Sequence, residues 1–226
     1  RSLDFIQPLL TPHTLLIFLQ NGISHLRYNN AEQLPATPVF ATSSEGATRL
    51  GAGHIRHAGS GHTYLGFLRP QDNGATTKLE QLLPILQNSG LASSLSNDIQ
   101  ANLWAKLFVN VGINGLTAIH NLKNGQLLHS SEMRDRLSRL VQETEQVARA
   151  AGIAIHDDPI QLTFEVCRRT AQNISSMLQD VRNHRPTEIA AINGAVSQIG
   201  KELQIPTPEN DALIARVLEI EANYPN

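Results

Sequence analysis

The sequence contains a single cysteine, Cys167, so no intramolecular disulfide can form and a reducing, cytoplasmic location is expected. Aromatic residues make up only 4% of the chain while hydrophobic residues reach 41%, so Ala, Leu, Ile and Val must fill the core. No apolar run is long enough to span a membrane. A formal net charge of −2 offers no basic surface for nucleic acid or an anionic membrane. These absences favour a soluble globular protein, and 226 residues can form one large domain or two modest ones.

The N-terminal part of the sequence resembles an α/β domain whose beginning has been removed. Apolar residues between Leu3 and Leu10 have helical spacing, and the apolar run Leu15–Leu19 then predicts a strand buried on both faces, as in a parallel sheet. Parallel strands are joined through crossover helices, and no partner strand lies upstream of Arg1. We therefore expect that part of a βαβ domain is missing.

Asn21 and Gly22 follow this first strand directly. Ligands bind at the carboxyl ends of strands in open α/β sheets, so Asn21 is a candidate ligand contact, although Asn-Gly is also common in ordinary turns. A helical turn is expected at residues 31–34, and residues 38–68 predict short strands separated by glycines. The Gly51-Ala52-Gly53 segment precedes a strand and not a helix, which argues against a phosphate-binding loop.

No metal site is expected. The spacing of His54, His57 and His62 would place successive histidines on opposite faces of a strand, which favours solvated side chains over metal ligands.

A polar turn at residues 69–74 marks the expected domain boundary. Residues 1–74 are assigned to the α/β domain and residues 75–226 to an all-helical domain, apart from a short strand near residues 91–94. The periodicity and capping residues predict helices over residues 77–87, 131–151, 159–171 and 177–182, and two more that begin at Thr187 and Thr207. A central helix within residues 101–126 is expected to be capped by Asn97 or Asp98.

The longest predicted helix lies within residues 101–126, which read ANLWAKLFVNVGINGLTAIHNLKNGQ. It is apolar on nearly every side, as a core helix is, but Lys106, Asn110 and Asn114 recur every fourth residue and share one face over roughly 12 Å. A buried ammonium is costly unless paired and its pKa falls readily, which suits proton transfer. The polar stripe predicts either a general acid with two ligand-binding asparagines, or a lysine that reaches solvent beside two backbone-bonded asparagines.

Other polar residues stand at predicted helix starts. Asn173 and Ser176 could bind an anion such as a carboxylate through the exposed N–H groups of a helix N-terminus, or could simply cap the helix. Glu188 follows the capping residue Thr187, where acidic residues are common because of the helix dipole. Either position can therefore be functional or purely structural.

Two segments, NLWAKLFVNVGINGLTAIHNLKNGQLL and NISSMLQDVRNHRPTEIAAINGAV, closely resemble the ketopantoate reductases (2-dehydropantoate 2-reductases). The resemblance extends over nearly the whole chain. It implies α/β plus all-α architecture, with a truncated Rossmann-like NADP-binding domain before a helical domain like that of 6-phosphogluconate dehydrogenase. It also implies NADPH-dependent reduction of ketopantoate to pantoate, on the route to pantothenate and coenzyme A, and it allows a homodimer through the helical domain.

The resemblance assigns roles to individual residues. Lys106 matches the catalytic lysine that protonates the carbonyl oxygen as hydride reaches its carbon. The residues that match the substrate-binding set are Asn21, Lys106, Asn110, Asn114, Asn124, Asn173 and Ser176. Those that match the cofactor-binding set are Asn21, Ala47 and Glu188.

Departures from the family pattern limit the expected activity. The glycine-rich G-x-G-x-x-G loop and the early basic residue that selects the NADP phosphate are absent, and Gly115 stands where the family often has proline. We therefore expect these 226 residues alone to be incompetent as a reductase. Two alternatives stay open: a related reductase of another 2-oxo acid, and a non-catalytic helical dimerisation module.

Overall fold

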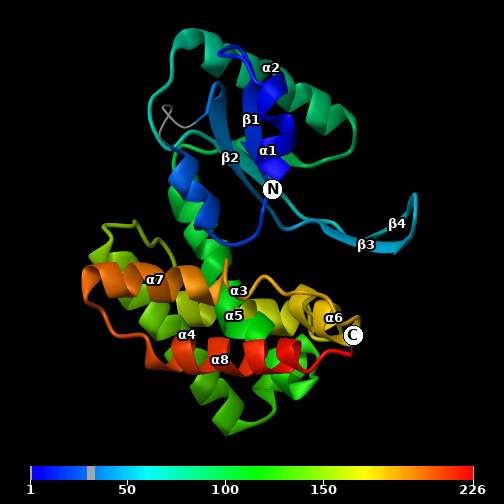
Figure 1. The fold of residues 1–226 in the computed structure, drawn as a ribbon, viewed down its shortest axis with the longest axis vertical. Helices are drawn as coiled ribbons and strands as arrows, with labels where there is room; N and C mark the ends of the chain where they lie inside the picture. Colours follow the sequence, from blue (N-terminus) through cyan, green and yellow to red (C-terminus); the bar gives the residue numbers. More distant parts are fainter. Residues whose placement is uncertain (1, 30–33, 226) are drawn as a thin grey trace. The chain divides into compact units, whose positions relative to one another are not determined.

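The computed structural model describes residues 2–29 and 34–225, and the chain divides into two units. The first unit comprises the residues up to Gln20 together with His25–Asn102, and the second comprises Asn21–Ser24 and the residues from Leu103 onward. The first is α/β and the second is helical, which confirms the predicted fold class (Figure 1). The boundary expected after residue 74 differs from this division, because the helix and strand that follow residue 74 pack in the first unit. The helical turn expected at residues 31–34 falls mostly outside the described residues.

The first unit is built on a four-stranded mixed sheet in the order β1-β2-β5-β6. Strand β1 (Leu15–Phe18) is parallel to β2 (Thr37–Ser43), β2 is antiparallel to β5 (Thr63–Gly66), and β5 is parallel to β6 (Ser93–Leu95). The parallel pairing predicted for residues 15–19 is therefore present. Only Phe18 of β1 is fully buried, however, because β1 is the last strand on its side of the described sheet.

The two faces of this sheet are covered by different elements. Helix α2 (Asn73–Asn88) places Leu79 against Val39, Ala41 and Leu65. Because side chains alternate along a strand, the neighbouring Phe18 and Phe40 point to the other face. There they stack with His25 and Tyr28 of η2 (Ser24–Asn29), with ring centroids 5.5–5.8 Å apart. The helical turns α1 (Ser2–Ile6) and η1 (Gln7–Leu9) precede β1.

A separate hairpin of β3 (Gly46–Gly51) and β4 (His54–Gly59) extends away from the main sheet (Figure 1). The Gly51-Ala52-Gly53 segment lies at its tip, in keeping with the argument against a phosphate loop. Strand β4 was expected, whereas the pairing of β3 with it was not. The ring of His57 in β4 is hydrogen-bonded to the Glu45 carboxylate at 2.7 Å.

The second unit contains six helices and one short 3-10 segment among its described residues. They are α3 (Ile99–His120, whose first residues belong to the first unit), η4 (Asn124–Leu128), α4 (Ser131–Ala150), α5 (Pro159–Arg169), α6 (Ser176–Arg182), α7 (Asn193–Leu203) and α8 (Pro208–Ala222). The predicted starts of α4 and α5 are confirmed, since Ser130 and Asp158 accept hydrogen bonds from the first-turn N–H groups.

The prediction of a helix beginning at Thr187 was wrong. Helix α7 begins at Asn193, and residues 188–192 form turns. One physical reason is that the carbonyl of Ala191 accepts a hydrogen bond from the N–H of Ile23, a residue far away in the sequence. Glu188 therefore lies in a turn and not in the first turn of a helix.

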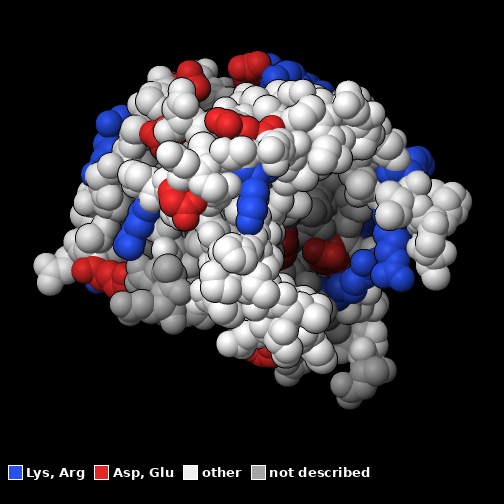
Figure 2. Space-filling model, turned by 90° about the horizontal axis from the view of Figure 1, so that it is seen from above, with Lys and Arg blue, Asp and Glu red and all other residues white. Residues whose placement is uncertain are grey.

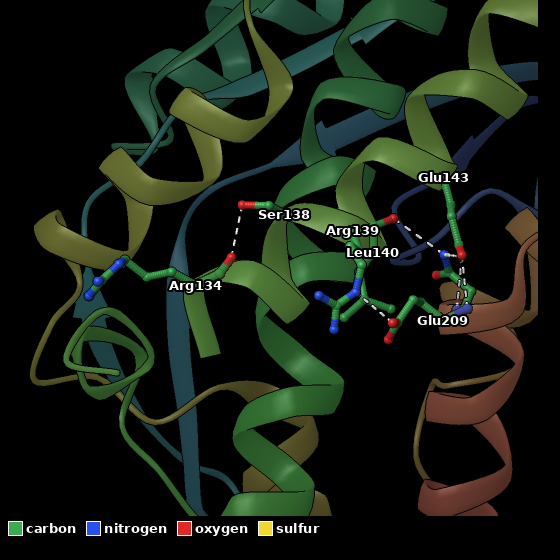
Figure 3. A network of polar contacts seen from close by, with 7 residues as sticks. Arg134, Ser138, Arg139, Leu140, Glu143 and Glu209 are labelled. Carbon is green, nitrogen blue, oxygen red and sulfur yellow. Dashed lines mark hydrogen bonds and ion pairs between the residues drawn. The ribbon is translucent and has the colours of Figure 1, made fainter. Parts of the chain in front are cut away.

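The start of α8 is capped from another helix (Figure 3). Thr207 precedes α8 but makes no capping hydrogen bond with its side chain. Instead, the carboxylate of Glu143 on α4 accepts from the N–H of Glu209 at 2.9 Å and the N–H of Asn210 at 3.0 Å. Arg139, also on α4, pairs with the Glu209 carboxylate at 2.6 Å. These contacts satisfy first-turn N–H groups of α8 and fasten it to α4.

Two further features concern membrane-spanning helices and surface charge. Within residues 2–29 and 34–225, no helix combines the length and apolar character needed to cross a bilayer. On the face drawn in Figure 2, Lys and Arg side chains are scattered among Asp, Glu and uncharged residues.

Candidate functional site

The polar stripe of α3 lies on a helix that is otherwise packed in the core. Leu107 and Val111, which are 1% and 0% exposed, belong to the apolar surface that holds the helix in place. Asn114 is buried, while Lys106 and Asn110 are half-buried. Burial lowers the pKa of Lys106 below its ordinary value, and the negative charge of Glu188 acts in the opposite direction. The ammonium is thus partly withdrawn from water and has a carboxylate close to it.

Asn21 reaches the same cluster from the segment that follows β1. Its side-chain amide donates to the Glu188 carboxylate at 2.9 Å, across 167 positions of the sequence. Gly22 makes this approach possible, because its φ of +74° is left-handed and a Cβ atom there would lie 2.0 Å from the carbonyl oxygen of Ala191. The N–H of Ile23 donates to that same oxygen at 3.3 Å. Residues 21–23 are therefore fitted against the turn that carries Glu188.

Glu188 links an amide and an ammonium in one polar cluster. Because it does not lie in the first turn of a helix, the helix dipole does not account for an acidic residue at this position. Its carboxylate instead accepts from Asn21 and stabilises the charged form of Lys106. The structure brings together three of the residues that the sequence singled out: Asn21, Lys106 and Glu188.

The beginning of α6 is tied to the end of the stripe. Ser175 and not Ser176 caps this helix, since the Ser175 hydroxyl accepts from the N–H of Leu178 at 3.1 Å. The same hydroxyl lies 2.7 Å from the hydroxyl of Thr117, which is buried one turn beyond Asn114 on α3. Ser176 is exposed and its hydroxyl is not the capping group. Sequence reasoning missed Thr117, whereas Ser175 lies within residues 173–176, the segment expected to cap this helix.

Asn124 and Asn173 meet through the backbone. The N–H of Asn124 donates to the carbonyl of Asn173 at 3.1 Å, and its side-chain amide donates to the Thr170 hydroxyl at 2.9 Å. Asn124 is only 7% exposed, whereas the Asn173 side chain is exposed. The described contacts therefore give Asn124 the role of fastening the segment between α5 and α6. The remaining expected cofactor contact, Ala47, is exposed on β3 of the first unit.

Comparison with protein families covers most of the chain. Residues 98–221 match the family model "Ketopantoate reductase PanE/ApbA C terminal", and residues 1–70 match "Ketopantoate reductase PanE/ApbA". A 2-dehydropantoate 2-reductase of Vibrio cholerae is 33% identical over 225 residues, which are 97% of this chain and 74% of that protein. A 2-dehydropantoate 2-reductase of Escherichia coli O157:H7 is 34% identical over 228 residues, 99% of this chain and 70% of that protein. Another, from Halobacterium salinarum, is 32% identical over 86% of this chain, which spans 63% of its length.

Solved structures agree with these relatives. A PanE/ApbA family ketopantoate reductase from Ralstonia eutropha JMP134 superposes with a TM-score of 0.85 and 29% identity, covering 96% of this chain and 70% of that one. A D-mandelate dehydrogenase in a ternary structure with NADH and anilino(oxo)acetate gives a TM-score of 0.86 and 28% identity over 97% and 72% of the two chains. A dimeric ketopantoate reductase from Staphylococcus aureus gives a TM-score of 0.81 and 25% identity, covering 98% of this chain and 74% of that one. With two family models spanning both units and relatives above 30% identity over two thirds or more of their length, the chain belongs to the ketopantoate reductase family.

Proposed function

We propose that this protein catalyses the NADPH-dependent reduction of ketopantoate to pantoate, with Lys106 as the general acid. The observation that carries the proposal is the cluster of a partly desolvated Lys106, the Glu188 carboxylate and the Asn21 amide. Membership in the family and the names of the relatives support the same reaction. Its product would serve the synthesis of pantothenate and coenzyme A, and the single cysteine fits a cytoplasmic location.

The chemistry of the reduction places its main demand on Lys106. Hydride, which the nicotinamide cofactor supplies when it is bound, adds to the carbonyl carbon, so negative charge develops on the carbonyl oxygen. A positioned ammonium stabilises that charge and then neutralises it by donating a proton. Partial burial makes the Lys106 proton easier to transfer, while Glu188 keeps the amine charged before the reaction.

The remaining polar side chains suit the rest of a small 2-oxo acid. Asn110 and Asn114 lie on the same face of α3 as Lys106 and can bind the oxygens of the substrate. We assign the carboxylate to the exposed side chains of Asn173 and Ser176. Asn124 contributes by holding this segment through Asn173 and Thr170.

The residues proposed to hold the cofactor fit a nicotinamide dinucleotide in their chemistry. Asn21 follows the carboxyl end of the parallel strand β1, which is where dinucleotides bind in open α/β sheets. Its side-chain amide is oriented by Glu188 and can bond to a carboxamide. We add Glu188 itself and the backbone of Ala47 to this set. The S. aureus relative also supports a homodimer, which we place at the helical unit and which sedimentation velocity would test.

The test of the function is the oxidation of NADPH and NADH with ketopantoate, measured on the protein as its gene encodes it. Lys106→Ala should lower kcat at least about 100-fold, because the proton donor is lost, while the circular dichroism spectrum stays unchanged. Lys201→Ala is the matched control, since Lys201 is an exposed lysine in the last turn of α7. Turnover of the Lys106 variant at the wild-type rate would refute its role.

The likeness to D-mandelate dehydrogenase favours a second candidate, the reduction of a different 2-oxo acid with NADH. A panel of branched and aromatic 2-oxo acids, each tested with both cofactors, separates the two by kcat/KM. A protein inactive on every member of the panel would instead be a non-catalytic helical module.

A further inference from the structure

Glu221, near the end of α8, makes two hydrogen bonds to a residue beside the site. Its Oε1 atom accepts from the N–H of Thr187 at 2.9 Å and from the Thr187 hydroxyl at 2.5 Å. An acidic side chain in the last turn of a helix is opposed by the helix dipole, and α8 has no basic residue in that turn. Helix stability therefore does not account for Glu221, whereas its bonds to Thr187 do.

Thr187 connects Glu221 to Glu188, because it directly precedes Glu188 in the chain. The Thr187 hydroxyl donates to Glu221 and accepts from the N–H of Ile189 at 3.2 Å. It therefore joins the residue before Glu188 to the residue after it. Glu188 in turn accepts from Asn21 and stabilises the charge of Lys106. The contacts form a continuous path from the C-terminal end of α8 to the polar cluster.

We propose that Glu221 is a positioning residue that, through Thr187, holds the Glu188 carboxylate against Lys106 and Asn21. The inference rests on the proposed function for its catalytic meaning, because Lys106 must be charged to act as the general acid. The positioning role itself concerns only how close Glu188 lies to Lys106, and it can be tested without measuring enzymatic activity.

The charged groups around Glu188 allow a competing explanation. Burial, Glu188 and Glu221 all raise the pKa of Asp180, and Arg185 opposes them, so these three charged groups lie within electrostatic reach of Asp180. Glu221 could then act by its charge and not through Thr187. Glu221→Gln separates the two, because both bonds end on one oxygen that the glutamine amide retains without the charge.

The deciding measurement is the titration of Lys106 by NMR in protein labelled with 13C at the lysine ε-carbon. The sequence has only four lysines, so Lys106→Arg assigns the signal. Glu221→Ala and Thr187→Val should lower the titration midpoint of Lys106 by roughly one pH unit, because the carboxylate moves away from the ammonium. Glu221→Gln and Thr187→Ser, which keep the hydrogen bonds, should match the wild type. Glu219→Ala is the control, since Glu219 pairs with Arg216 on the same helix.

Two results would overturn the proposal. One is an unchanged Lys106 midpoint in Glu221→Ala and Thr187→Val, with only the melting temperature lowered, which would make the contact purely structural. The other is a shift in Glu221→Gln equal to that in Glu221→Ala, which would make charge the cause. In active protein the alkaline limb of the kcat profile should move to lower pH in the same two variants. An inactive wild type would refute the proposed function but leave the NMR test of the positioning role intact.

Discussion

Replacement of Gly22 by alanine tests how the site is assembled, because this glycine lies where Asn21 meets the turn that carries Glu188. Two separate costs are expected. A left-handed alanine costs about 1–2 kcal/mol, and Gly22 has a φ of +74°. The added Cβ would also lie 2.0 Å from the Ala191 carbonyl oxygen, whereas real Cβ atoms keep at least 3.0 Å. The segment must then retreat by about 1 Å, and such overpacking costs about 1–3 kcal/mol.

Gly152 provides a closely matched control. Its φ of +73° is nearly the same, it lies in the same unit, and a Cβ atom added there meets nothing within 4 Å. Gly152→Ala should therefore cost only the backbone strain, while Gly22→Ala should cost about 1–3 kcal/mol more. The smaller entropy of unfolded alanine is common to both variants and cancels in the comparison.

Urea unfolding followed by circular dichroism measures the difference. The Gly22 variant should also lose the 2.9 Å bond between Asn21 and Glu188, because a retreat of about 1 Å would lengthen it to about 3.9 Å, beyond hydrogen-bonding range. If Gly22→Ala destabilises the protein no more than Gly152→Ala does, the close approach to Ala191 is not a constraint and the argument fails.

Two further predictions concern stability. Glu143→Ala should lower the free energy of unfolding in urea by about 2–3 kcal/mol, because the N–H groups of Glu209 and Asn210 lose a charged acceptor. The control Glu145→Ala breaks only a surface ion pair within α4 and should cost less than about 1 kcal/mol. Equal losses in the two variants would contradict the capping role of Glu143. Burial lowers the pKa of His25 from 6.5 to about 4, so the unfolded chain takes up a proton first as the pH falls. Unfolding free energy should therefore decrease by about 3 kcal/mol between pH 6.5 and 4, and His25→Phe should remove that part of the slope; a wild-type slope retained in the variant would rule this out.

The elements predicted correctly are those whose signals are local in the sequence. Helix α3 and its stripe follow from periodicity, and the starts of α4 and α5 follow from Ser130 and Asp158, which bond within their own first turns. The helix expected at Thr187 failed because the carbonyl of Ala191 bonds to Ile23, a contact that no local pattern contains. The predicted start of α8 at Thr207 is confirmed, but the sequence did not predict that Glu143 on α4 accepts from its first-turn N–H groups.

The sequence by itself determined the α/β and helical classes, the family resemblance, and the alignment of Lys106, Asn110 and Asn114 on one helix face, because each depends on residue order and helical geometry alone. Only the tertiary structure decided that Glu188 joins Lys106 and Asn21, that Ser175 reaches Thr117, and that Glu221 reaches Thr187. The hydrogen bonds among these contacts join residues between 34 and 167 positions apart, and the longest of them depends on a glycine whose backbone alone fits against Ala191. Packing between distant segments therefore decides the electrostatic environment of the lysine that the sequence pointed to.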